Sequence, residues 1–150
     1  MTGKPSRTPD FPALLAKADL AGPYRLRPDQ APTALAAARQ LGLSVAEIGL
    51  DGDFLAELGR QLQFPEHYGA NFDALYDCLT DLAASPGQGC LLLFTGAPAP
   101  AAGVDEDDEG SPVDTLIAVL QAAGDEWREQ DRPLWALFAV PGLALDSLPA

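Results

Sequence analysis

The sequence has few of the residues that enzymes use for proton transfer, nucleophilic attack and metal binding. Its 150 residues include one histidine, His67, and two cysteines, Cys78 and Cys90. It contains no glycine-rich phosphate loop, no nucleophile-elbow motif and no cysteine pair at metal-ligand spacing. A zinc site would need three or four ligands. We therefore expect no catalytic residue, no metal site and no bound cofactor, and two cysteines are too few for a disulfide framework.

Basic residues are also scarce, because nine Lys and Arg face 22 Asp and Glu, which gives a formal net charge of −13. A charge of this sign repels polyanions, which argues against direct binding to nucleic acid or to anionic membranes. The longest apolar run, Cys90 to Phe94, is far shorter than the roughly 20 residues of a membrane helix. Residues 1–11 lack the apolar segment of a signal peptide. We expect a cytoplasmic protein whose cysteines remain thiols.

Hydrophobic residues make up 47% of the chain and charged residues 21%, a composition that supplies one globular domain with a core. The charge is unevenly divided: residues 1–44 hold six basic and three acidic side chains, whereas residues 45–150 hold three basic and nineteen acidic ones. Prolines surround one short apolar patch near the N-terminus. We predict an N-terminal extension over residues 1–22 that contains one helix and can be flexible, a single domain over 23–143, and a C-terminal tail over 144–150.

Periodic apolar residues and turn signals divide the rest of the chain into alternating helices and strands. The continuous apolar run from Cys90 to Phe94 is typical of a strand buried on both faces. Strands separated by helices favour an α/β fold, a small parallel sheet packed with helices. We expect the first predicted strand and the helix that follows it to form an N-terminal strand-helix extension of this sheet. The pattern predicts helices at 33–41, 54–62, 71–82 and 113–127 and strands at 24–26, 43–50, 90–94 and 134–140.

The helix predicted at 71–82 has two chemically different faces. Asn71 is a good N-cap, and Asp73 suits the positive end of the helix dipole. Tyr76 and Asp77 share a face with Asp73, and this helix has no basic residue at a matching spacing. That face is either a solvated acidic surface or an electronegative docking surface for a partner, and the pattern leaves both open. The opposite, core-facing side carries the apolar residues Phe72, Leu75, Leu79 and Leu82.

Five consecutive acidic residues, 105–109, lie in a loop predicted over residues 97–112. Acids at the first, third and fifth positions, followed by a glycine at the sixth, superficially match a calcium-binding loop. The twelfth position is Leu116, where such a loop requires a bidentate glutamate, so the match fails. We interpret the run as a solvated loop that adds to the long-range field.

A dense motif lies between Phe64 and Asp81. Its residues are Pro65-Glu66, Tyr68-Gly69, Asn71, Asp73-Ala74-Leu75 and Asp77-Cys78-Leu79-Thr80. This stretch resembles the central loop and helix of the barstar family, intracellular inhibitors of a small secreted ribonuclease. Weaker similarity to the family extends from about residue 45 to residue 140, about two-thirds of the chain. The stretch 24–42 resembles the extra front segment of longer bacterial barstar-related proteins.

The resemblance implies a barstar-like fold and inhibition by a plug in the active site of a nuclease. It implies that Asn71 and Asp73 keep the family residue. Asp77 keeps the dominant acidic contact of the family. Gly69 keeps the glycine that lets the backbone approach the partner. Partner binding would then come from a loop and helix in the middle of the chain, and no residue would be catalytic.

Some positions depart from the family pattern. His67 stands where the family has a contacting aromatic residue, and Tyr76 replaces a tryptophan, so the target can be a different nuclease. His67 can instead be a turn residue hydrogen-bonded to backbone, and Tyr68 is expected in the core. The family also uses a glutamate on its last long helix, for which Asp125 and Glu126 are alternative equivalents.

The resemblance implies a small basic ribonuclease as the partner, either the cell's own secreted enzyme or an incoming toxin. We expect the free inhibitor to be a monomer. The alternative is a binding module that uses the same face for a different basic protein and inhibits no ribonuclease. An enzyme that depends on His67 is a third reading, which the shortage of catalytic residues disfavours.

Overall fold

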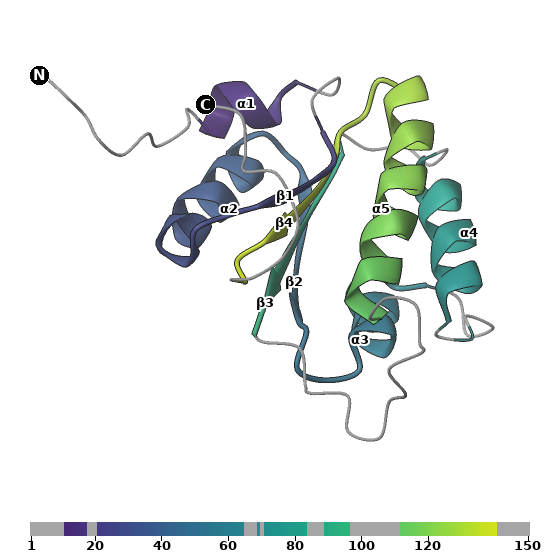
Figure 1. The fold of residues 1–150 in the computed structure, drawn as a ribbon. Helices are drawn as coiled ribbons and strands as arrows, with labels where there is room; N and C mark the ends of the chain where they lie inside the picture. The colour runs from purple at the N-terminus through teal and green to yellow at the C-terminus, as the bar shows by residue number, and fades with distance from the viewer. Residues whose placement is uncertain are drawn as a thin grey trace, which may run out of the picture.

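The computed structural model describes residues 11–17, 21–64, 69, 71–83, 89–96 and 112–140. These residues form a four-stranded parallel sheet with the strand order β1-β4-β3-β2 (Figure 1). The predicted α/β class with a small parallel sheet is therefore confirmed. The strands are β1 (Pro23–Arg25), β2 (Ser44–Gly49), β3 (Cys90–Thr95) and β4 (Leu134–Phe138). The helices are α1 (Phe11–Leu15), α2 (Ala31–Gln40), α3 (Phe54–Gln61), α4 (Phe72–Ala83) and α5 (Pro112–Glu129), and a 3₁₀ turn, η2 (Pro28–Gln30), precedes α2.

Local signals in the sequence set the ends of several elements. The side chain of Asp53 caps α3, because its Oδ1 accepts a hydrogen bond of 3.1 Å from the N–H of Ala56. Gly42 ends α2 with a φ of 80°, a conformation that glycine adopts without strain. Each predicted helix and strand is present, with ends moved by at most two residues. Most of the predicted loop, residues 97–111, lies outside the described residues.

The central strand β3 is buried on both sides, as its continuous apolar run predicts. Leu91 and Leu93 belong to the core covered by α1 and α2, whereas Leu92 and Phe94 belong to the core covered by α3, α4 and α5 (Figure 1). Successive side chains of a strand point to opposite faces, so an apolar strand of this kind needs a helical layer on each side. The described part of the chain therefore has three layers, with the sheet in the middle.

The larger core lies between the sheet and the layer of α3, α4 and α5. Phe94 of β3 and Phe138 of β4 stack in it with ring centroids 4.5 Å apart. Trp127 of α5 is buried in this core. Each helix contributes fully buried leucines, which are Leu58 of α3, Leu75 and Leu79 of α4, and Leu116 of α5. This packing places α4 in an outer layer, with one face packed on the core and the other exposed.

The smaller core lies on the other face of the sheet, beneath α1 and α2. Trp135 of β4 is completely buried there, and its Nε1–H donates a hydrogen bond of 3.0 Å to the carbonyl oxygen of Leu15. Tyr24 of β1 packs against the same indole, with ring centroids 5.8 Å apart. Residues 11–15, in the segment predicted as an N-terminal extension, thus cover apolar surface of β3 and β4.

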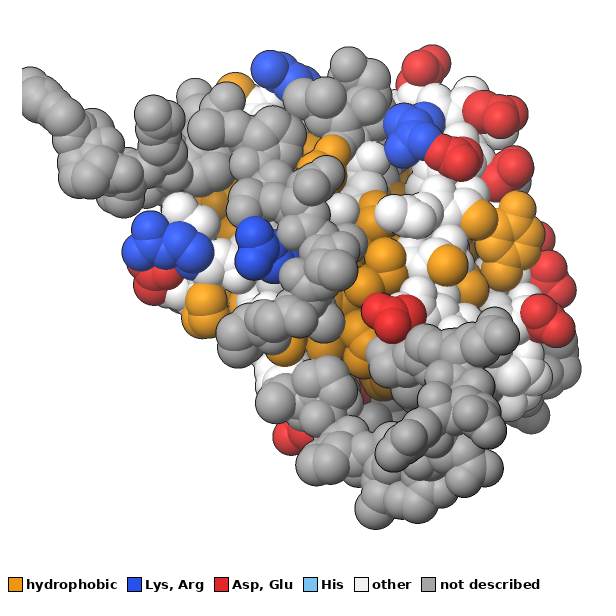
Figure 2. Space-filling model, in the orientation of Figure 1, with side chains coloured by type: hydrophobic (Ala, Val, Ile, Leu, Met, Phe, Trp, Pro, Cys, Tyr) orange, Lys and Arg blue, Asp and Glu red, His pale blue; other side chains and the backbone are white. Residues whose placement is uncertain are grey.

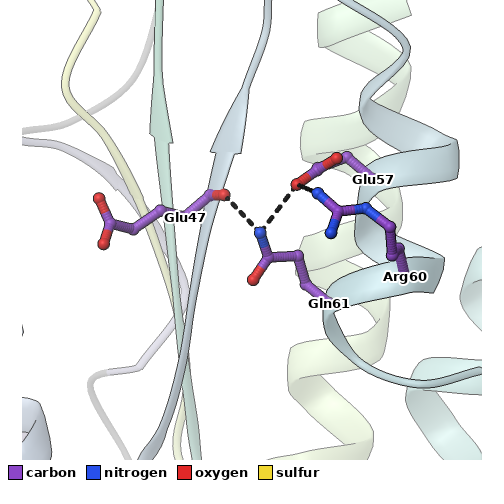
Figure 3. Close-up of polar contacts among 4 residues, drawn as sticks. All are labelled: Glu47, Glu57, Arg60 and Gln61. Atoms are coloured by element: carbon purple, nitrogen blue, oxygen red, sulfur yellow. Dashed lines mark hydrogen bonds and ion pairs between the residues drawn. The ribbon is translucent and has the colours of Figure 1, made fainter.

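The strand β2 forms one edge of the sheet, and a side chain covers part of that edge (Figure 3). Gln61 Nε2 donates hydrogen bonds to the carbonyl oxygen of Glu47 at 3.3 Å and to Oε2 of Glu57 at 2.8 Å. Arg60 pairs with the same carboxylate. The hydrogen bond from Arg60 lowers the pKa of Glu57 most, and the hydrogen bond from Gln61 lowers it further. This network ties α3 to β2 and occupies a backbone acceptor that an edge strand would otherwise leave open.

Leu15→Ala is expected to lower the free energy of unfolding by about 2–5 kcal/mol, because it leaves a cavity at a fully buried position against Trp135. The control is Arg39→Ala at an exposed position of α2, for which we expect a change within about 0.5 kcal/mol. Urea denaturation followed by tryptophan fluorescence measures both values. Equal stability of the Leu15→Ala variant and the unmodified chain would show that α1 does not stabilise the sheet.

Candidate partner-binding site

The described part of the motif at 64–81 contains a helix N-terminus built around Asn71. The Oδ1 of Asn71 accepts a hydrogen bond of 2.8 Å from the N–H of Ala74, and its carbonyl oxygen accepts one of 2.9 Å from the N–H of Leu75. The predicted N-cap is therefore confirmed. A Cβ atom added at Gly69 would lie 3.0 Å from Nδ2 of Asn71, closer than side chains normally pack. Glycine at this position lets the chain pass beside the capping side chain.

The apolar face of α4 is anchored as predicted. Leu75 and Leu79 are completely buried in the larger core, and Phe72 and Leu82 are half-buried against it. Tyr76 is also half-buried and packs against this core. Part of the Tyr76 side chain therefore packs against the core, and the rest is exposed beside the acidic face of the helix. Burial of one face makes α4 a stiff support for the residues on the other.

The outer face of α4 carries Asp73, Asp77 and Asp81, which follow one another every four residues and are all exposed. Four residues of helix rise about 6 Å, so the three carboxylates form one row along the helix. The helix contains no Lys or Arg. The carboxylates of Asp73 and Asp77 make no hydrogen bond or ion pair with another residue in the described ranges. Figure 2 shows acidic side chains gathered on the side of the molecule formed by α4 and α5.

The two acidic residues considered on α5 differ in their surroundings. Both are exposed, but Asp125 forms an ion pair with Arg128 one turn along the same helix. They precede Trp127 by two residues and by one, and the indole N–H of Trp127 donates a hydrogen bond of 2.9 Å to the carbonyl oxygen of Leu79. This part of α5 therefore lies beside the C-terminal half of α4.

Some predicted features lie outside the described residues. They are His67, Tyr68 and the acidic run at 105–109. Among the residues that the structure does describe, no group of three or more His, Cys, Asp and Glu side chains is arranged to hold a metal ion. None of the described helices combines the length and the apolar character that crossing a membrane requires.

Both cysteines are buried free thiols. Burial raises the pKa of the Cys78 thiol, and the negative charges of Asp81 and Asp77 raise it further. Burial raises the pKa of Cys90 to about 12. The positive charge of Arg132 opposes this rise at Cys90 without cancelling it. The thiolate is the reactive form of cysteine, so the raised pKa makes both thiols poor nucleophiles. Cys78 therefore acts as a packing residue beside the core face of α4.

Comparison with known proteins identifies the family. The model of the family described as Barstar (barnase inhibitor) matches residues 38–139, more than half of the chain. The matched range contains α3, α4, α5 and the strands β2, β3 and β4. The chain therefore belongs to the barstar family, whose members are inhibitor proteins and not enzymes. No curated protein and no solved structure gives a significant match.

Two features of the site are not evident from the sequence. One is the close approach of Gly69 to the side chain of Asn71, which requires a folded loop. The other is the contact between α4 and the end of α5, where Trp127 reaches Leu79 across 48 positions in the chain. Hydropathy does not reveal which backbone carbonyl the N–H of a buried tryptophan will meet.

Asn71→Ala is expected to lower the free energy of unfolding by about 0.5–2 kcal/mol, because the N–H of Ala74 loses its acceptor. Asn71→Ser is the matched variant, since a serine hydroxyl can accept the same bond, and it should retain most of the stability. Chemical denaturation checks both. If the two variants lose the same amount, the cap is not what stabilises the start of α4.

Native Cys90 is expected to react far more slowly than an unfolded cysteine with a thiol reagent at pH 8. A rise in pKa from 9.0 to about 12 leaves roughly a thousandfold less thiolate at that pH, in addition to the steric protection. Cys78 should react faster than Cys90 but more slowly than a free thiol. Labelling with mass spectrometry, with a urea-unfolded sample as control, measures both rates. Rapid labelling of native Cys90 would contradict its burial.

Proposed function

We propose that this protein inhibits a small basic ribonuclease by inserting the outer face of α4 into the active-site cleft of the enzyme. The family to which it belongs inhibits barnase-type ribonucleases. The observation that supports the use of α4 is the exposure of Asp73 and Asp77 on a helix that lacks cations and whose other face is buried. Binding would occlude the cleft, and no chemical step would be needed.

The chemistry of the target explains why carboxylates suit this task. A ribonuclease must hold the phosphodiester oxygens of its substrate, so its cleft presents Arg, Lys and His side chains. A carboxylate in the position of a phosphate accepts charge-assisted hydrogen bonds from the same groups, which are roughly twice as strong as neutral ones. In this proposal, Asp77 makes the dominant contact and Asp73 a second one, nearer the start of the helix.

The rigidity of α4 reduces the entropic cost of binding. Asp77 lies between the two completely buried leucines of the helix, Leu75 and Leu79, so its backbone is already held before the partner arrives. Groups that are ordered in the free protein lose less conformational freedom on association than groups on a loose loop. A short helical row of carboxylates thus presents a preorganised substitute for part of an RNA chain.

The remaining site residues have supporting roles in this proposal. The exposed part of Tyr76 supplies a flat surface at the rim of the cleft, and His67 would supply another. Gly69 allows the partner to approach the backbone closely, and Asn71 maintains the start of the helix on which the acids stand. The replacement of the family's tryptophan by Tyr76 favours a target whose rim differs from that of barnase.

The net charge of −13 supports the choice of a basic partner. Long-range attraction raises the association rate of oppositely charged proteins, and salt screens it. We propose that the protein acts as a cytoplasmic monomer, against either the cell's own secreted enzyme or an incoming toxin. A panel of small bacterial ribonucleases, assayed for RNA cleavage with and without the protein at several salt concentrations, tests the proposal.

Asp77→Ala is expected to weaken inhibition at least about 30-fold, because it removes a central acidic contact. The matched control is Glu47→Ala on β2, which removes the same charge and whose carboxylate points away from α3 (Figure 3). It should weaken inhibition no more than about threefold, mainly through the association rate. Asp107→Ala in the acidic run should behave like the control.

Equal losses in all three variants would show that total charge, and not the outer face of α4, accounts for binding. Failure of the unmodified protein to inhibit any enzyme of the panel, together with capture of a different basic protein that Asp77→Ala abolishes, would favour the alternative binding module.

A further inference from the structure

The C-terminal end of α5 places two side chains against α4: Trp127 from the last turn of the helix and Arg132 from the turn that follows it. Asp131 has a φ of 58°, in the left-handed region. Its N–H donates to the carbonyl oxygen of Arg128 at 2.9 Å, and the N–H of Arg132 donates to the carbonyl oxygen of Trp127 at 3.0 Å. This pair of bonds is the Schellman motif that closes many helices. It reverses the chain so that the guanidinium of Arg132 lies 4.6 Å from the centroid of the Trp127 ring.

Both of these side chains donate hydrogen bonds to backbone carbonyls of α4. Trp127 Nε1–H donates to the carbonyl oxygen of Leu79 at 2.9 Å, in a buried position. Arg132 Nη1–H donates to the carbonyl oxygen of Leu82 at 2.7 Å. The last four carbonyls of a helix have no hydrogen-bond donor within the helix, and the carbonyl of Leu82 is one of these four. The end of α5 therefore supplies a donor to one of the unpaired carbonyls at the C-terminal end of α4 and a second bond one turn earlier.

These bonds supply a constraint that apolar packing does not. Leucines on the inner face of α4 hold the helix against the core, but hydrophobic attraction is not directional. A hydrogen bond has a preferred length and angle, so two of them from the end of α5 fix the position of α4 along its own axis. That position determines where Asp73 and Asp77 lie on the outer surface.

We propose that Trp127 and Arg132 are positioning residues for the partner-binding face of α4. They contact no partner themselves and act by fixing the helix that carries the acidic row. This inference rests on the proposed function for its effect on inhibition, but its effect on α4 itself is independent of any partner. Neither residue belongs to the sequence motif at 64–81, so their role is a property of the tertiary structure.

The second tryptophan supplies a matched control. Trp135 is completely buried and Trp127 nearly so, and the Nε1–H of Trp135 also donates to a backbone carbonyl, that of Leu15, at 3.0 Å. That bond lies in the smaller core, on the opposite side of the sheet from α4. Trp127→Phe and Trp135→Phe therefore remove the same chemical interaction and a similar volume, one beside α4 and the other beside α1.

The first experiment is hydrogen exchange of the full-length free protein, read by mass spectrometry of peptides from α4 and β3. In Trp127→Phe, exchange in the C-terminal half of α4 should rise about fivefold or more relative to exchange in β3, because a buried bond to this helix is lost. In Trp135→Phe the ratio between α4 and β3 should stay as in the unmodified protein. Equal changes of the ratio in both variants would overturn the proposal.

The second experiment measures inhibition of a ribonuclease from the panel. Trp127→Phe should raise the inhibition constant about fivefold, and Trp135→Phe less than about twofold. Should Trp127→Phe fold poorly, Arg132→Met tests the same position from the half-buried side, with Arg132→Lys as the conservative variant that can still donate to Leu82. Arg132→Met should weaken inhibition and Arg132→Lys should restore part of it.

The two experiments separate the inference from the proposed function. If the unmodified protein inhibits no ribonuclease, the proposed function fails, and the exchange ratio still decides whether Trp127 holds α4 in place. If the protein inhibits a ribonuclease but both tryptophan variants weaken inhibition equally, the positioning role is refuted and the proposed function stands.

Discussion

The complete burial of β3 and β4 is the constraint on which the rest of the structure depends. All five residues of β4 are buried, and in β3 only Thr95 is exposed. Strands of this kind leave no face for water, so the chain must supply helices on both sides. The layer of α3, α4 and α5 covers one face and the layer of α1 and α2 covers the other. The acidic helix is held in place because it belongs to one of these required layers.

The two layers differ in charge as well as in position. Segments before residue 45 supply most of the basic side chains, and segments after it supply nearly all of the acidic ones. Figure 2 shows the acidic side chains concentrated where α4 and α5 form the surface. The match to the barstar family begins at residue 38, so α1 and β1 precede the matched range. One layer thus carries the acidic surface of α4 and α5, and the other covers the opposite face of the sheet.

Much of the fold follows from local pattern, and so does part of the site. The apolar run at 90–94 predicts its own burial on both faces, and Asn71 followed by Asp73 predicts the start of α4. The half-burial of Tyr76 is less accessible to such reasoning, because the helical pattern assigns this residue to the acidic face while its ring also reaches the core. Helix α5 also ends two residues later than predicted. Its closing turn places Asp131 in the left-handed conformation, to which aspartate is less suited than glycine.

The sequence by itself determined the class of fold, the core face of α4 and the row of acids opposite it, because these depend on periodicities of two and of three to four residues along the chain. The family motif between residues 64 and 81 also needs no structure to be read. Only the tertiary structure decided which distant groups meet. Trp127 and Arg132 reach carbonyls of α4 across 48 and 50 positions, and Trp135 reaches α1 across 120. Such contacts depend on how layers stack across a sheet, which no local pattern encodes.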